Sequence, residues 1–241
     1  MRQRNRERGP VSKVEFPLAV RAVGIDLDGT MLDTVEDLCN AVNHTLSELR
    51  LPQLDLELVR TFVGKGLANL VERSLRAALG REPDEALLSS ALPVYEANYE
   101  RVNGDTTTIY PGVREGLDAL VGADFPLACI TNKSTRFTGP LLERIGFAHY
   151  FPVVVCGDTL PKKKPDPMPL THAAQCFAVQ PAEMLMIGDS INDAQAARAA
   201  GCPVFCVTYG YNEGHDVRTL DVDAIVPSLT EAAALIRKHP A

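Results

Sequence analysis

Residues 23–30, which read VGIDLDGT, constrain the fold more than any other part of the sequence. The apolar run that opens this segment predicts a buried strand, and the strand stops at an acidic residue. Residues two apart in an extended chain point to the same side, so the carboxylates of Asp26 and Asp28 face one space. Gly29 allows a sharp turn there, and Thr30 can cap the next segment of the chain. Because a D-x-D pattern is also common in surface turns, its interpretation depends on the rest of the chain.

Short apolar strands alternate with helices in the second half of the chain. Strands are expected at 126–130, 153–156, 184–187, 204–208 and 224–226, with a closing helix at 230–238. This alternation is typical of βαβ units and predicts an α/β fold with a doubly wound, mainly parallel sheet. Apolar positions in 35–105 recur only at helical spacing. We therefore expect a basic, disordered tail at 1–19, a core domain at 20–34 and 106–241, and an inserted all-helical domain at 35–105.

Four polar clusters come after the ends of predicted strands. They are Asp26 with Asp28, Thr131 with Asn132, the loop Lys162–Lys164, and Asp189 with Asp193. Each cluster has an ordinary explanation alone, since the Thr-Asn pair can cap a helix, the lysines can be solvated, and the last two acids can favour a helix N-terminus. Ligands of parallel sheets bind at the carboxyl ends of the strands. The shared position of the four clusters therefore favours a single site.

The residue types in these clusters suit the hydrolysis of a phosphate monoester, which depends on positioning and on charge stabilisation. In this interpretation Asp26 attacks phosphorus and forms an aspartyl-phosphate, and Asp28 exchanges protons with the leaving group and water. Thr131 and Asn132 donate hydrogen bonds to the phosphoryl oxygens, and Lys164 neutralises negative charge.

The same clusters predict a magnesium site, because Mg²⁺ prefers carboxylate and phosphate oxygens as ligands. The expected ligands are Asp26, Asp28 and Asp189, with support from Asp193 one helical turn further on.

Bulk properties exclude several other classes of function. The net charge of −7 argues against a nucleic-acid-binding surface, and no apolar stretch is long enough to cross a membrane. The basic start of the chain has no apolar segment after it, so a secretory signal is not expected. The six cysteines form no C-x-x-C pair, and three of them lie in apolar runs. We expect reduced thiols and a cytoplasmic protein, monomeric or homodimeric, whose partner is a small molecule.

The sequence resembles the haloacid dehalogenase superfamily over residues 21–238. The four motifs of that superfamily match Asp26-Leu27-Asp28-Gly29-Thr30, Thr131-Asn132, Lys164-Pro165-Asp166-Pro167, and Gly188-Asp189-Ser190 with Asp193. The resemblance implies a Rossmann-like core and a helical C1-type cap inserted between the first two motifs.

Within the superfamily, residues 63–66, 110–113, 157–158, 163–167 and 207–212 are most similar to bacterial phosphoglycolate phosphatases. This likeness implies 2-phosphoglycolate as the substrate, with Gly29, Thr131 and Asn132 around it. The carboxylate of that substrate needs a donor from the insertion, for which Lys65 and Gly66 are candidates, although Lys65 can equally be a solvated loop residue.

Three alternatives differ in chemistry. A true dehalogenase releases halide and needs neither Mg²⁺ nor an acid at Asp28. A phosphoacceptor receiver module is shorter and carries its acceptor after a middle strand. A phosphosugar mutase, or a phosphatase for another small metabolite or sugar, uses the same core and remains an alternative. Measuring whether free phosphate or an isomer is formed distinguishes a phosphatase from a mutase.

Overall fold

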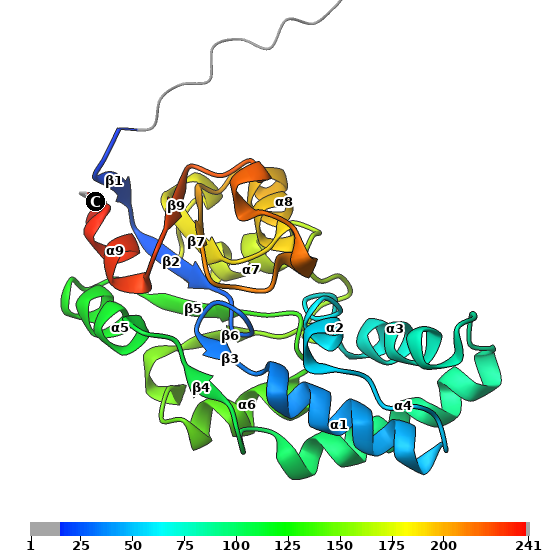
Figure 1. Ribbon diagram of the computed structural model, residues 1–241. Coiled ribbons are helices and arrows are strands. Elements are labelled where there is room, and N and C mark those ends of the chain that lie inside the picture. Colours follow the sequence, from blue (N-terminus) through cyan, green and yellow to red (C-terminus); the bar gives the residue numbers. More distant parts are fainter. Residues whose placement is uncertain (1–14, 240–241) are drawn as a thin grey trace, which may run out of the picture.

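The computed structural model of the protein describes residues 15–239 and is built on a six-stranded parallel sheet (Figure 1). In spatial order the strands are β6 (Val153–Val155), β5 (Leu127–Ile130), β2 (Ala22–Ile25), β7 (Met184–Gly188), β8 (Val204–Val207) and β9 (Ala224–Val226). Strand β2 lies between β5 and β7, where Ile25 is opposite both Cys129 and Ile187. The predicted doubly wound α/β sheet is confirmed, and the carboxyl ends of its three central strands lie next to one another.

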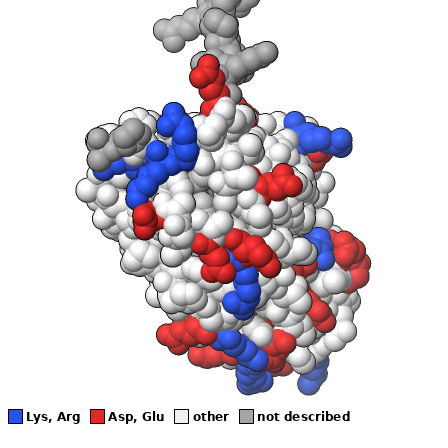
Figure 2. Space-filling model, turned by 90° about the vertical axis from the view of Figure 1, so that its left-hand side faces the viewer, with Lys and Arg blue, Asp and Glu red and all other residues white. Residues whose placement is uncertain are grey.

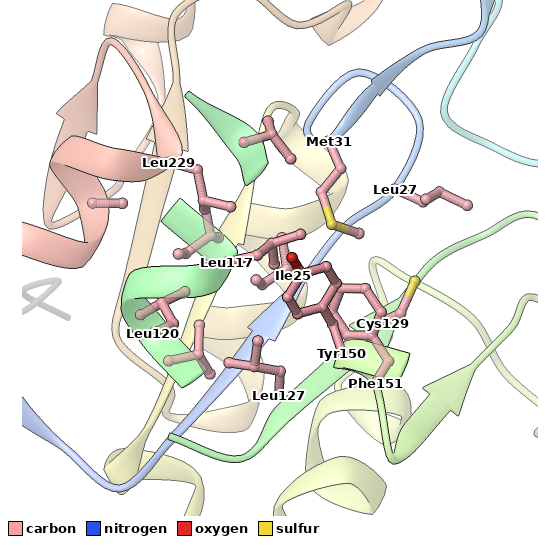
Figure 3. Close-up of a cluster of buried hydrophobic side chains, with 14 of the residues drawn as sticks. Ile25, Leu27, Met31, Leu117, Leu120, Leu127, Cys129, Tyr150, Phe151 and Leu229 are labelled. Carbon is pink, nitrogen blue, oxygen red and sulfur yellow. The ribbon is translucent and has the colours of Figure 1, made fainter. Parts of the chain in front are cut away.

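Helices cover both faces of the sheet, and successive strand residues divide between the two faces. In β2, Val23 and Ile25 pack toward α5 (Val113–Gly122), α6 (Thr135–Arg144) and α9 (Leu229–Ala234). Figure 3 shows this layer, with Ile25 close to Leu117 of α5. The other residues of β2 pack toward α7 (Met168–Cys176) and α8 (Ile191–Ala200). Burial on both faces explains why the strands are continuous apolar runs.

The chain leaves the sheet after β2 and forms four helices. They are α1 (Val35–Glu48), α2 (Leu56–Arg60), α3 (Leu67–Leu79) and α4 (Glu85–Val102). Their apolar faces form a hydrophobic cluster separate from the two clusters of the sheet. Asp55 and Asp84 cap the starts of α2 and α4, because each carboxylate accepts a hydrogen bond from a backbone N–H three residues on, at 2.8 Å.

Two short strands and one buried carboxylate join the four helices to the sheet. Strands β3 (Leu32–Asp33) and β4 (Thr108–Ile109) pair antiparallel where the chain leaves and returns. Asp37 of α1 is fully buried and accepts five hydrogen bonds from the returning segment 104–107. The Asp37 side chain, at the start of the insertion, therefore holds in place the backbone segment by which the chain returns to the sheet.

The structure corrects two expectations at the ends of the chain. Residues 18 and 19, predicted as part of a tail, belong to β1 (Leu18–Val20), which pairs with β10 (Ile236–Lys238). The helix predicted over 230–238 ends at Ala234 as α9, because the chain then extends to form β10. The rest of the predicted tail, up to residue 14, lies outside the described residues. Short 3₁₀ turns occupy Ala148–Tyr150, Pro181–Glu183, Asn212–Gly214 and Val217–Thr219.

The helices, the distribution of surface charge and the cysteines bear on three expectations from the sequence. Within 15–239, every helix is too short or too polar to span a bilayer. Acidic and basic side chains are interspersed over the face shown in Figure 2, without a broad basic area. All six cysteines are free thiols and five are buried, including Cys129, Cys156 and Cys206, which the sequence placed in apolar strands.

Candidate active site

The predicted polar clusters meet at the carboxyl edge of the sheet. Asp26 follows β2, Thr131 follows β5, and Asp189 follows β7. All three side chains are buried, although they are polar. Because buried polar groups are costly unless paired, their common position indicates a built site rather than a surface feature.

Asp26 lies at the centre of this edge. One oxygen of its carboxylate accepts a hydrogen bond from the Leu27 N–H at 2.7 Å and lies 2.9 Å from Lys164 Nζ. Burial raises the pKa of Asp26 well above its usual range; Lys164 opposes this shift, while the nearby carboxylates of Asp193 and Asp189 add to it. The Asp26 carboxylate is therefore poorly solvated, as a reactive nucleophile should be. It needs positive charge nearby to remain ionised.

Lys164 supplies one of those charges. Its side chain is 2% exposed, and Nζ is 2.6 Å from the Ile130 carbonyl oxygen and 2.7 Å from Asp193 Oδ1, in addition to its contact with Asp26. An ammonium group has three N–H donors, so these three acceptors use all of them. The ammonium is thus fixed between the nucleophile and α8.

Three carboxylates form a candidate cation site. Oxygens of Asp26, Asp189 and Asp193 lie within 4.8 Å of one another, and all three residues are buried. Burial and repulsion from Asp193 raise the pKa of Asp189 to about 7, although hydrogen bonds from the Tyr211 N–H (2.7 Å) and the Thr30 hydroxyl (3.0 Å) favour its charged form. An oxygen-only set of crowded acids fits a hard divalent cation.

Asp193 is held more firmly than the other two acids. Its Oδ2 accepts hydrogen bonds from the Ser190 hydroxyl at 2.8 Å and the Ser190 N–H at 3.1 Å, in a capping box at the start of α8. Its other oxygen contacts Lys164. With both oxygens engaged, Asp193 holds Lys164 and the start of α8 in place, and its role in supporting a metal ion stays a prediction.

Asp28 lies apart from the three-carboxylate cluster. Its Oδ1 accepts a hydrogen bond from the Thr34 hydroxyl and forms an ion pair with Lys133 Nζ, both at 2.7 Å. The structure therefore does not bring the Asp28 side chain to the cluster in which it was expected as a metal ligand. It does place Asp28 beside Asp26 along one cavity, as an acid and base requires.

A small cavity of about 50 Å³ lies between the sheet edge and the four helices. The sheet side contributes Asp26, Asp28, Thr131, Asn132 and Lys133, and the helical side contributes Leu38, Val63, Gly64, Gly66, Leu67, Leu70 and Tyr99. The helical side is mostly apolar, so it excludes water from the polar edge of the sheet.

Residues 25–207 match the family described as haloacid dehalogenase-like hydrolase. The chain belongs to this family. It is 58% identical over 225 residues to a phosphoglycolate phosphatase of Nitrosospira multiformis, which covers 93% of this chain and 99% of that protein. It is 51% identical to a phosphoglycolate phosphatase of Thiobacillus denitrificans, over 92% of this chain and 98% of that one.

A solved structure with the same fold is described as a predicted phosphoglycolate phosphatase from Haemophilus somnus 129PT. It has a TM-score of 0.84 and 32% sequence identity, and the match covers 88% of this chain and 96% of that one. The α/β core of the haloacid dehalogenase-like hydrolases, expected from the sequence motifs, is thereby confirmed.

Several residues of this haloacid dehalogenase-like hydrolase have surroundings that differ from those expected. The two amide hydrogens of Asn132 are directed at the carbonyl oxygens of Gly64 and Lys164, each at 2.9 Å, so its side chain has no N–H left for a phosphoryl oxygen. The side-chain oxygen of Thr131 accepts a hydrogen bond from the Lys133 N–H at 3.1 Å, which leaves the hydroxyl hydrogen of Thr131 available for a phosphoryl oxygen.

The two glycines expected around the substrate differ in position. Gly29 has a φ of +88°, and a side chain there would collide with the Asp189 carboxylate, so the glycine allows the first and last motifs to pack together. Gly66 lines the cavity, as expected. Thr30, predicted as a cap for the next segment, hydrogen bonds to Asp189 instead.

Lys65 does not line the cavity. Its ammonium pairs with Glu213 at 2.7 Å, and Glu213 also pairs with Arg73 at 3.2 Å. Its backbone carbonyl accepts a hydrogen bond from Lys163 Nζ at 2.8 Å. In the structure, Lys65 therefore joins the helical insertion to the loop after β8 instead of reaching the substrate space.

Lys133 lines the cavity, although the sequence analysis did not single it out. It directly follows Thr131-Asn132, its side chain is 5% exposed, and it contacts Asp28. A lysine beside a predicted phosphate-binding pair at a strand end was the available signal. A single lysine in a loop is usually solvated, however. Lys133 is buried because Tyr99, which is distant in the sequence, packs over it, with Nζ 5.0 Å from the centre of the ring.

Proposed function

We propose that this protein is a phosphatase that hydrolyses a small phosphate monoester, with 2-phosphoglycolate as its substrate. The names of the relatives described above support the substrate. The chemistry is supported mainly by one observation: Asp26 and Asp28 line the same small cavity, while Lys164 contacts Asp26 from the buried side.

The reaction begins when a carboxylate oxygen of Asp26 attacks phosphorus. The P–O bond to the leaving group breaks, the leaving oxygen takes a proton from Asp28 in its protonated form, and an aspartyl-phosphate forms on Asp26. Water then attacks phosphorus while Asp28, now a carboxylate, takes its proton; the bond between Asp26 and phosphorus breaks, the phosphate is released, and both aspartates return to their starting forms. The Thr131 hydroxyl donates a hydrogen bond to a phosphoryl oxygen, and Lys164 reduces the repulsion between carboxylate and phosphate.

We further propose Mg²⁺ as the cation of the acidic cluster, held by Asp26 and Asp189 with Asp193 behind them. These residues fit the ion because their carboxylate oxygens are crowded together, and because the raised pKa values of Asp26 and Asp189 are a shift that a divalent charge would reverse. When bound, Mg²⁺ supplies positive charge beside the phosphoryl oxygens.

Helices α1 to α4 are proposed to act as a cap domain over residues 35–105. Their mostly apolar side covers the cavity that Asp26 and Asp28 line, and it reduces the access of bulk water to these carboxylates. The free thiols fit a reducing compartment, and we place the enzyme in the cytoplasm as a monomer or homodimer.

Replacing the nucleophile tests the proposal. Asp26→Asn keeps the side-chain volume but removes the attacking charge, so kcat for phosphate release should fall by about 10⁴-fold or more, the scale of losing a nucleophile. In the wild type, BeF₃⁻ should bind at Asp26 as a mimic of the intermediate. Substantial turnover by the variant would mean that another group attacks.

A screen of phosphate monoesters with Mg²⁺ tests the substrate. We expect 2-phosphoglycolate to exceed hexose phosphates in kcat/KM, with free phosphate as the product. Isomer formation without phosphate release would identify a mutase, and a preference for hexose phosphates would leave only the phosphatase chemistry.

A further inference from the structure

The cavity contains two carboxylates of the protein and must also accept an anionic substrate. Among the described residues that line it, Lys133 is the only one with a positive charge. Lys164, the other buried cation nearby, already has three acceptors for its three N–H donors. Among the described residues that line the cavity, Lys133 is therefore the cationic donor available to a second anionic group of a substrate.

Lys133 has donors to spare. Its side chain is 5% exposed, and among the residues that the structure describes Nζ has one hydrogen-bond acceptor, Asp28 Oδ1 at 2.7 Å. The Tyr99 ring lies on another side of the ammonium, 5.0 Å away. Buried N–H donors without acceptors are unfavourable. A ligand oxygen that enters the cavity would satisfy them.

Lys133 lies close to Thr131, the residue proposed to contact the phosphoryl group. Its backbone follows Thr131 by two residues, and its N–H donates to the Thr131 hydroxyl oxygen at 3.1 Å. Both side chains line the same cavity, so one ligand can contact Thr131 through its phosphoryl group and Lys133 through a second anionic group.

We propose that Lys133 is the residue that recognises the carboxylate of the substrate, so that the enzyme selects phosphate monoesters carrying a carboxylate on the leaving group. This inference rests on the proposed function, and it assigns to Lys133 the task that the sequence suggested for Lys65. Lys65 pairs with Glu213 outside the cavity lining. Tyr99 holds the ammonium in place from the side of the helical cap.

The test compares two phosphate esters of similar size: 2-phosphoglycolate, and 2-phosphoglycolamide, in which a neutral amide replaces the carboxylate. In the wild type we expect kcat/KM to favour the acid by about 10- to 100-fold, the range for a hydrogen bond between charged groups. Lys133→Met should reduce that ratio to near one. Because Lys133 also contacts Asp28, the variant should lose rate on both esters, and only the ratio reports carboxylate recognition.

Matched variants provide the controls. Lys162→Met removes an exposed lysine of a neighbouring loop, 63% exposed and paired with Asp166, and should leave the ratio as in the wild type. Lys65→Met should also retain it. If Lys133→Met does not fold, Lys133→Gln provides the same comparison with a neutral polar side chain.

Each contrary outcome is distinct. If the wild type favours the acid and the Lys133 variants keep that preference, the inference is wrong and the proposed function stands. If Lys65→Met abolishes the preference instead, the carboxylate is read from the cap. If the wild type hydrolyses both esters equally, the phosphoglycolate assignment and the inference both fail. If it releases phosphate from neither ester, the phosphatase proposal itself is at fault.

Discussion

At the scale of single residues, Asp189 links proton binding to metal binding. Its pKa is raised to about 7 because burial and Asp193 disfavour its charge, whereas an unfolded chain would ionise it near pH 4. Between those values the folded protein keeps a proton that the unfolded chain releases, so this group's contribution to stability falls as the pH rises toward 7. Above pH 7 the folded protein carries a buried charge that a cation can compensate.

Stabilisation by Mg²⁺ should therefore increase with pH. We expect the Mg²⁺-induced rise in Tm to be small at pH 5.5 and larger at pH 8, because the ion binds the ionised carboxylates and must displace protons at low pH. Thermal unfolding with and without Mg²⁺ measures this, and Asp189→Asn should lose most of the effect. An equal rise at both pH values would show that these acids do not hold the ion.

At the scale of secondary-structure elements, α1 and the segment after α4 depend on each other through Asp37. This carboxylate accepts hydrogen bonds from Gly104, Thr106 and Thr107 and is fully buried. Asp37→Ala should lower the free energy of unfolding by about 3 kcal/mol or more, because several buried N–H and O–H donors would be left unsatisfied. Urea denaturation measures the change.

The nearby Asp105 is a suitable control for Asp37. It lies in the same connection, but its carboxylate is half-exposed and pairs with Arg144 at 2.7 Å. Asp105→Ala should cost less than about 1 kcal/mol, as exposed ion pairs usually do. Equal losses for the two variants would show that burial of the Asp37 carboxylate is not what stabilises the connection.

At the scale of the whole molecule, the proposed metal site joins carboxylates from segments far apart in the sequence, Asp26 after β2 and Asp189 after β7. EDTA should abolish phosphate release and Mg²⁺ should restore it, whereas Ca²⁺, which is larger and tolerates more ligands, should bind without restoring activity. A coupled phosphate assay measures both effects. Undiminished activity in EDTA would contradict the proposed role of the acidic cluster.

The sequence predicts the sheet and most of the site because the signals are local. Asp26, Thr131 and Asp189 each follow an apolar strand directly, and parallel strands bring such ends to one edge. The missed features depend on distant contacts. Lys65 pairs with a residue 148 positions away, and Ile236–Lys238 extends because strand β1 from the other end of the chain pairs with it. Hydrophobic periodicity carries no information about such partners.

The Glu213 bridge sets an energy scale for opening the proposed cap. Its pairs with Lys65 and Arg73 are partly exposed, so each contributes about 0.5 to 1 kcal/mol. Together they would favour a closed form over an open one by a factor of about 5 to 30, in addition to the other contacts between the insertion and the core. Because salt screens these pairs, ionic strength would control how long the product is retained.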